Sequence, residues 1–291
     1  MERIGSLLCE LGISTEHSIE PFYPRVRDRD DVAVLRCRRS GVILLSRSDH
    51  MSAAHYEDVE TFHYWDAHDR LAAARSTLED DRRRQTQFQG TIRGRKWIDV
   101  GTGAGGVLDL LAPMAAEAVA VEPQAGARAA LAAAGYRVYR SLEDVPDADF
   151  EVVTLFHVFE HLTDPIATLA TLRQKMTAGA KLIVEVPHAR DFLLAYLDLE
   201  AFKAFTFWSE HLILHTRESL RAFLTDAGFS KVLVTGYQRY PLANHLHWLA
   251  TGRPGGHVAW ACLRSREVDE AYANLLASLD YTDTLIAVAE T

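Results

Sequence analysis

The sequence predicts an α/β protein built on a doubly wound, mostly parallel sheet. From residue 96 onward, short β-prone segments alternate with longer helical segments. This alternation is typical of parallel strands, because each crossover between them needs a connection long enough to hold a helix. The stretch W-I-D-V-G-T-G-A-G-G, residues 97–106, places four glycines directly behind the first of these strands. In a doubly wound sheet ligands bind at the carboxyl ends of the strands, so this loop is the first candidate binding site.

The first ninety residues have a different character. Residues 32–46 contain two β-prone runs separated by a turn with Gly41, which predicts a hairpin whose partner strands the sequence does not reveal. Residues 52–88 have helical periodicity. Their aromatic cluster between Tyr56 and Trp65 is either a packing face or a lid beside a ligand pocket. Gly90 marks the boundary to the alternating part.

After this boundary the predicted elements follow in regular order. Thr216 can cap the helix that follows it, and Gly228 can end that helix. The predicted organisation is an N-terminal α+β extension over 1–90 (hairpin and helical lid), a ligand-binding domain over 91–265 and a C-terminal helix over 266–291. Strands are expected at 96–100, 118–121, 137–139, 150–156, 181–186, 231–236 and 258–264, and helices at 106–114, 126–134, 165–176, 217–227 and 268–288.

Charge and composition exclude several classes of protein. The net charge of -9 argues against a nucleic-acid partner, because phosphate binding requires clustered Lys and Arg. The run Arg82-Arg83-Arg84 follows Glu79-Asp80-Asp81, which predicts an exposed helix face of mixed charge. The three cysteines are widely spaced, which predicts reduced thiols and a cytoplasmic protein. No apolar run reaches the roughly 18 residues of a membrane span, so no membrane partner is expected. The oligomeric state stays open, and a homodimer is compatible with the sequence.

The glycine loop alone permits two kinds of ligand. Gly101-x-Gly103-x-x-Gly106 matches the dinucleotide fingerprint, which favours an NAD(P)-dependent oxidoreductase. Asp99 precedes the loop by two residues, and its carboxylate would repel a pyrophosphate but attract an ammonium group. Glu122, at the end of the second strand, suits the hydroxyls of a ribose in either case.

Taken together, the motifs resemble the class I S-adenosylmethionine-dependent methyltransferases that act on small molecules. The resemblance covers about 93–265. It implies an enzyme with S-adenosylmethionine as cofactor and a Rossmann-like sheet of seven strands in the order 3-2-1-4-5-7-6, the seventh antiparallel. The matching motifs are an E/D-x-G-x-G-x-G loop at 99–105, the acidic Glu122-Pro123, F-E-V-V at 150–153, an H-x-x-E-H-x-x-D-P segment at 157–165 and L-I-V-E-V-P at 182–187.

The resemblance also implies a set of cofactor-binding residues. The glycine loop would approach the methionine part of the cofactor, the next strand end would hold the ribose, residues 141–143 would lie near the adenine and residues 156–157 would border the sulfonium. The residues implied are Asp99, Gly101, Thr102, Gly103, Gly105, Glu122, Pro123, Ser141, Leu142, Phe156 and His157.

The acceptor is predicted less directly. F-W-S-E-H-L-I-L-H-T, residues 207–216, looks like the segment that closes the acceptor pocket in related enzymes acting on sugars and other small metabolites. O-methylation of a sugar or nucleotide-linked sugar, in surface-glycan or natural-product biosynthesis, is therefore the expected reaction. A cofactor-binding scaffold without catalysis is the remaining alternative.

Methyl transfer mainly requires alignment of nucleophile, carbon and leaving sulfur, and needs a base only when the acceptor is protonated. Four residues beyond strand ends are the predicted catalytic groups: His161, His211, His157 and Glu160, with His188 and Glu210 as further candidates. Glu160 and His161 alternatively serve only to fix the loop. Quinone-type O-methyltransferases carry a divalent metal on a related E-x-x-E-H segment. His157 occupies the first position here, so a metal stays an open alternative and no metal ligand is predicted. His245 and His247 alternate as on a strand or loop, where they either line the pocket or pack.

Overall fold

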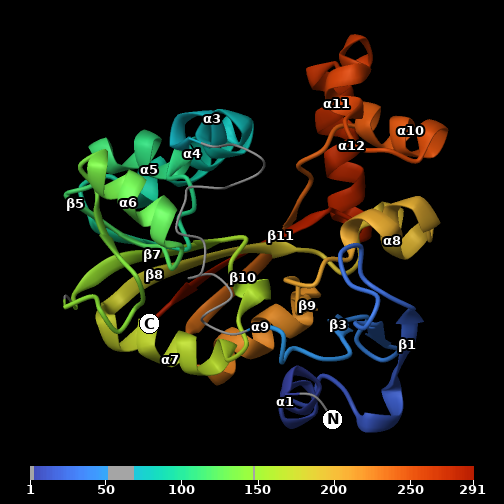
Figure 1. Ribbon diagram of the computed structural model, residues 1–291, viewed down its shortest axis with the longest axis horizontal. Coiled ribbons are helices and arrows are strands. Elements are labelled where there is room, and N and C mark those ends of the chain that lie inside the picture. The colour runs from blue at the N-terminus through green and yellow to red at the C-terminus, as the bar shows by residue number, and fades with distance from the viewer. Residues whose placement is uncertain (1–2, 52–68, 147) are drawn as a thin grey trace.

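The computed structural model describes residues 3–51, 69–146 and 148–291 (Figure 1). Its main element is a seven-stranded sheet in the order β10-β11-β8-β7-β4-β5-β6. Numbered within this sheet, the order is 3-2-1-4-5-7-6 read from β6, and only the last strand, β11, runs antiparallel to its neighbours. The predicted fold class is confirmed. The strands are β4 (Lys96–Val100), β5 (Glu117–Val121), β6 (Arg137–Tyr139), β7 (Phe150–Phe156), β8 (Met176–Pro187), β10 (Ser230–Tyr237) and β11 (Thr284–Glu290).

Helices cover both faces of this sheet (Figure 1). Side chains alternate along β4: Trp97 packs with the helices of one face, and Ile98 packs with those of the other. The inner strands β4, β7, β8 and β11 are largely buried and mostly apolar, whereas the edge strands β6 and β10 are largely exposed or half-buried. One face carries α4 (Leu78–Ile92), α5 (Gly106–Leu111), the short η2 (Ala112–Met114) and α6 (Ala125–Ala133), and the other carries α7 (Pro165–Lys175) and α9 (Arg217–Asp226).

The N-terminal part forms a second, antiparallel sheet. The predicted hairpin is confirmed as β2 (Val34–Cys37) and β3 (Ile43–Leu45), and Gly41 in its turn has a φ of 78°. The partner strands are β1 (Ile19–Tyr23) and β9 (Ile213–Leu214). Because β9 comes from the methyltransferase-like part of the sequence, the N-terminal extension and segment 207–216 are joined by backbone pairing. Helix α1 (Arg3–Glu10) and η1 (Glu16–Ser18) complete this part.

Two sequence predictions at the C-terminal end are wrong. Residues 258–264 are not a strand but belong to the short helices α11 (Gly256–Ala259) and η5 (Ala261–Leu263). Residues 266–291 are not all helix: α12 (Arg266–Leu279) ends at Asp280, which has a φ of 60°, and β11 follows. Short apolar runs do not distinguish strand from helix by periodicity. What places β11 is the gap between β8 and β10, where both of its edges find backbone partners.

The remaining helices lie outside the main sheet. α10 (Leu242–Thr251), α11 and α12 form a protrusion between β10 and β11 (Figure 1). The π-helix η4 (Phe192–Tyr196) and α8 (Glu200–Thr206) precede β9, and η3 (Phe159–His161) follows β7. Of the predicted helical region 52–88, the structure describes α3 (Arg70–Ser76) and the beginning of α4, whereas the aromatic cluster Tyr56 to Trp65 lies outside the described residues. Within the described part of the chain, no helix combines the length and apolar character needed to cross a membrane.

Candidate functional site

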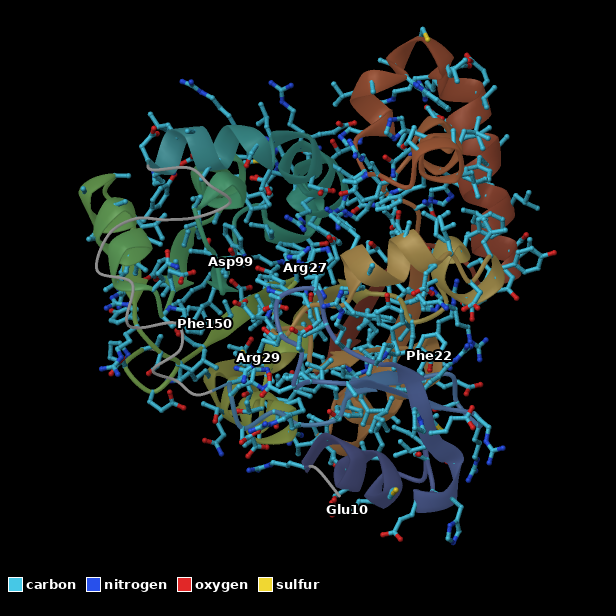
Figure 2. The ribbon with its side chains drawn as sticks, turned by 45° about the vertical axis from the view of Figure 1, so that its right-hand side comes forward. Glu10, Phe22, Arg27, Arg29, Asp99 and Phe150 are labelled. Atoms are coloured by element: carbon cyan, nitrogen blue, oxygen red, sulfur yellow. The ribbon has the colours of Figure 1, made fainter. Side chains whose placement is uncertain are left out.

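Asp99 lies beneath the glycine loop, near the end of β4. Its side chain is buried and accepts a hydrogen bond of 2.5 Å from the hydroxyl of Thr154 on β7. Thr154 in turn accepts a hydrogen bond of 2.8 Å from Nε1 of Trp97. Burial raises the pKa of Asp99 to about 6. Figure 2 shows Asp99 in the part of the molecule that carries the large sheet, whereas Phe22 and Arg27 lie in the N-terminal part.

The glycines of the loop are required by its backbone. Gly101, Gly103 and Gly105 all have positive φ, between 56° and 76°. A Cβ on Gly101 would lie 2.4 Å from a methyl group of Val158, and one on Gly105 would lie 2.4 Å from Leu131. A larger residue at Gly101 or Gly105 would therefore be strained in its backbone conformation and would overlap a neighbouring side chain.

Glu122 is joined to the same loop. Its buried carboxylate accepts hydrogen bonds of 2.8 Å from the amides of Gly103 and Gln124. Burial raises its pKa, although the two amides counteract this effect. Ser141 donates a hydrogen bond to Asp144, and the side chain of Leu142 packs in the core. These contacts hold the loop after β6 in place.

Helix α4 supplies residues that the sequence analysis missed. A cavity of about 60 Å³ is lined by the glycine loop, Asp99, Phe156 and, from α4, Asp81 and Arg84. The expected exposed face of mixed charge is thus wrong, because both α4 residues are buried and Arg84 donates to Asp81 over 3.2 Å. The signal was present in the spacing: the buried residues of α4 fall at 81, 84, 88 and 92, which is one helical stripe.

Glu185 on β8 is the centre of the buried charges. It is fully buried and accepts hydrogen bonds of 2.7 and 2.8 Å from Arg83 and one of 2.8 Å from Arg84. Burial opposes its ionisation, but the guanidinium groups and His157 hold its pKa well below its usual range. A carboxylate within the apolar strand L-I-V-E-V-P was the available signal, since a buried charge requires partners.

His157 joins this network to the segment after β7. It has a φ of 56°, and its amide donates to the carbonyl of Glu185. Its Nδ1 lies 3.2 Å from Glu160 and its Nε2 lies 3.2 Å from Glu185 and 3.0 Å from Arg239. Burial and Arg239 lower the pKa of His157, but the two carboxylates outweigh them and the net shift is upward. Arg239, which follows β10, is itself paired with Asp80 of α4.

Long-range contacts bring His211 next to His161. The amide of Leu212 donates to the carbonyl of Glu160 over 2.9 Å. From the N-terminal part, Asp28 accepts hydrogen bonds from the amide and hydroxyl of Ser209. Segment 207–216 is therefore held between η3 and the N-terminal sheet.

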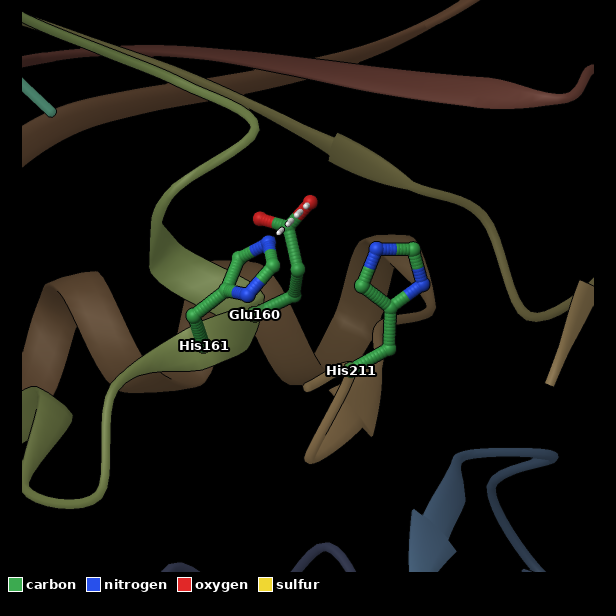
Figure 3. A group of neighbouring side chains, drawn as sticks. All are labelled: Glu160, His161 and His211. Atoms are coloured by element: carbon green, nitrogen blue, oxygen red, sulfur yellow. Dashed lines mark ion pairs between the residues drawn. The ribbon is translucent and has the colours of Figure 1, made fainter. Parts of the chain in front are cut away.

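Glu160, His161 and His211 form the resulting cluster. One ligand-type atom from each lies within 4.8 Å of the others. Figure 3 shows Glu160 and His161 extending from η3 toward His211 on the facing segment. Burial lowers the pKa of His211 to about 3. Burial raises the pKa of Glu160, but His157 and the other neighbouring imidazoles outweigh it and lower the value to about 2.

The other candidate histidines lie elsewhere. His188 is buried, with Nδ1 at 2.9 Å from the carbonyl of Thr282. His245 and His247 are on helix α10 and not on a strand or loop as expected. His245 hydrogen-bonds the hydroxyl of Tyr272 on α12, which indicates a packing role in the protrusion.

Comparisons with known proteins agree with this geometry. A family model described as methyltransferase domain matches residues 66–234, more than half of the chain. The chain therefore belongs to this family and is a methyltransferase. The assignment favours the methyltransferase interpretation of the glycine loop over the oxidoreductase interpretation.

Similar solved structures are found at low sequence identity. An S-adenosylmethionine-dependent methyltransferase from Archaeoglobus fulgidus is 20% identical, with a TM-score of 0.51, and the match covers 77% of this chain and 95% of that one. A possible histamine N-methyltransferase from Thermotoga maritima is 14% identical (TM-score 0.46, coverage 76% and 90%). Phosphoethanolamine N-methyltransferase 2 from Haemonchus contortus is 13% identical (TM-score 0.46, coverage 73% and 52%). A search of curated proteins returned no match.

Proposed function

We propose that this enzyme transfers the methyl group of S-adenosylmethionine to a hydroxyl of a small polar acceptor, a sugar or nucleotide-linked sugar. The observation that carries the proposal is the cluster of Glu160, His161 and His211. It offers a carboxylate and two imidazoles beyond the end of β7, the strand that pairs with β4 in the sheet. A hydroxyl, unlike an amine with a free lone pair, must lose a proton during transfer, so it is the acceptor that needs such groups.

The cofactor assignment follows from charge. The methionine tail carries an ammonium and a carboxylate, and the cavity beside the loop offers carboxylates from Asp99 and Asp81 and the guanidinium of Arg84. Glu122 retains acceptor capacity for the ribose hydroxyls beyond its two amide hydrogen bonds. We assign Pro123, Ser141 and Leu142 to the adenosine side, and Phe156 and His157 to the border of the sulfonium.

The reaction is a direct displacement. The bond from the methyl carbon to the acceptor oxygen forms as the bond to sulfur breaks, the sulfonium becomes a thioether, and the hydroxyl proton leaves the acceptor. Positioning by the pocket supplies several kcal/mol of the barrier reduction. The cluster assists removal of the proton, which is worth about 10²- to 10⁴-fold in rate.

Cofactor affinity is expected to depend on pH through Asp99. Its raised pKa of about 6 means that the carboxyl is mostly neutral below that pH and ionised above it. Because only the ionised form attracts the ammonium group, the Kd for S-adenosylmethionine should fall by about tenfold between about pH 5 and pH 7. Calorimetry checks this. Asp99→Asn should bind S-adenosylmethionine weakly at both pH values. Asp226→Asn, a change at an exposed residue, should show the same pH dependence of the Kd as the wild type. No cofactor binding at millimolar concentration contradicts the whole assignment.

The acceptor class is tested by turnover. Sugars, nucleotide sugars, amines and thiols are incubated with enzyme and S-adenosylmethionine, and products are searched by mass for one added methylene. We expect products only from hydroxyl acceptors, and His161→Gln should lower kcat by about 10²- to 10⁴-fold with unchanged cofactor Kd. His17→Gln, an exposed histidine in the N-terminal part, is the matched control. Methylation of amines alone excludes the hydroxyl acceptor.

A further inference from the structure

We propose that Glu160, His161 and His211 bind a divalent transition-metal cation on the acceptor side of the site. The sequence predicted no metal ligand, because His157 occupies the position where the related metal-binding segments have Glu. Folding replaces His157 in that set by His211, which lies about fifty residues further along the chain. Only the catalytic role of this cation rests on the proposed function, since binding itself requires no acceptor or cofactor.

The donor set suits a transition metal. One carboxylate and two imidazoles form the protein ligands of several catalytic zinc and iron sites, and three ligands leave a position open for substrate or water. Metal bonds of about 2.1 Å place tetrahedral donor atoms about 3.4 Å apart. The donor atoms here lie within 4.8 Å of one another, so they would have to approach by up to about 1.4 Å to bind one cation.

Two buried atoms in the cluster point to a missing partner. Glu160 is fully buried, yet its Oε2 has no hydrogen-bond partner among the residues that the structure describes. The same is true of Nδ1 of His211 in that part of the chain. An unsatisfied buried polar atom costs about 1–3 kcal/mol, and more when it is charged. A cation between the two residues would satisfy the carboxylate, and it would give the imidazole a ligand role.

His161 is oriented as a metal ligand would be. Its Nε2 faces Glu160 at 3.8 Å, and its Nδ1 faces the carboxylate of Glu210 at 3.8 Å. A proton on Nδ1 directed at Glu210 leaves the lone pair of Nε2 directed at the cluster. The two groups are at ion-pair distance, and a small side-chain movement would form the carboxylate–histidine hydrogen bond that usually supports histidine ligands in metal sites.

The position also gives the cation a use. A hydroxyl bound at the open position would have its pKa lowered, in the same way as metal-bound water. Its proton would then leave to solvent as the oxygen attacks the methyl carbon and the carbon–sulfur bond breaks. No other reactant is needed.

The experiment measures binding of Co²⁺ and Zn²⁺ to the untagged, chelator-treated protein without cofactor or acceptor. Calorimetry gives stoichiometry and Kd, and the visible absorption of Co²⁺ reports its ligands. We expect one cation per chain at micromolar concentration, with Mg²⁺ binding much more weakly because it prefers oxygen ligands. His211→Gln and Glu160→Gln should abolish the site, and Glu210→Gln should weaken it by about 10- to 100-fold. His17→Gln should bind as the wild type does.

Melting temperature and S-adenosylmethionine binding of each variant show whether it is folded; if Glu160→Gln unfolds, His211→Gln and the partly exposed His161→Gln carry the test. The proposal is overturned if the wild type binds no Co²⁺ or Zn²⁺ near equimolar amounts at about 100 μM. Equal binding by the folded ligand variants overturns it too. If the enzyme keeps its full methylation activity in excess chelator, the catalytic role of the cation is contradicted, but cation binding is not. Metal binding without cofactor binding contradicts the proposed function but not the metal site.

Discussion

Glu185→Gln is expected to lower the free energy of unfolding by about 3–5 kcal/mol, because it leaves Arg83 and Arg84 buried without their carboxylate. For a chain of this size, that corresponds to a fall in Tm of about 5 to 15 °C by calorimetry. Because the pKa of Glu185 is depressed in the folded state, its contribution is present above the ordinary carboxyl pKa and is lost as the pH falls. The difference in the free energy of unfolding between Glu185→Gln and the wild type should therefore become smaller at acidic pH.

Glu117→Gln is the matched control for this prediction. Glu117 pairs with Arg137 at the protein surface, where both side chains are about 40% exposed. Exposed pairs contribute about 0–1 kcal/mol, so this variant should unfold close to the wild-type temperature. If the two variants were equally stable, the buried network around Glu185 would not be what fixes α4 against β8.

Gly101→Ala is expected to abolish most cofactor binding and to reduce stability. Alanine at a φ of 70° costs about 1–2 kcal/mol, and its Cβ would lie 2.4 Å from Val158. Relief of that overlap moves either the loop or the residue next to His157, at a further cost of about 1–3 kcal/mol. We expect the Kd for S-adenosylmethionine to rise at least tenfold in calorimetry.

Two companion variants separate the causes. Gly101→Ala with Val158→Ala removes the overlap but not the backbone strain, so it should recover only part of the affinity. Gly90→Ala is the control, since Gly90 lies within helix α4 and a Cβ there meets no atom within 4 Å among the described residues. That change should be neutral or stabilising by about 0.5–1 kcal/mol. Wild-type cofactor affinity in Gly101→Ala would show that the ligand does not approach this loop.

The N-terminal extension acquires a role through these contacts. Residues 1–90 contain no recognisable chemical motif, yet Asp28 accepts hydrogen bonds from Ser209, and β3 pairs with β9 just beyond His211. The extension therefore fixes the segment on which the acceptor side depends. We propose that it positions the segment that carries His211 and so supports the acceptor side of the site.

The sequence by itself determined the doubly wound layer and the place of the glycine loop behind its first strand. Strand and helix periodicity, the glycine loop and Glu122 are local signals, since each depends on residues adjacent along the chain. Local signals failed at 258–264 and at β11, because an apolar run becomes a strand only where a neighbouring strand offers hydrogen bonds.

Only the tertiary structure decided the polar interior of the site. Arg84 and Glu185 are a hundred residues apart, and His161 and His211 are fifty. The packing of α4 on the sheet buries Arg84 against Glu185. The positions of η3 and β9 bring His161 close to His211. The spacing along α4 indicates which of its residues are buried, but not which residues of other segments they contact. Those contacts depend on chain segments meeting in space.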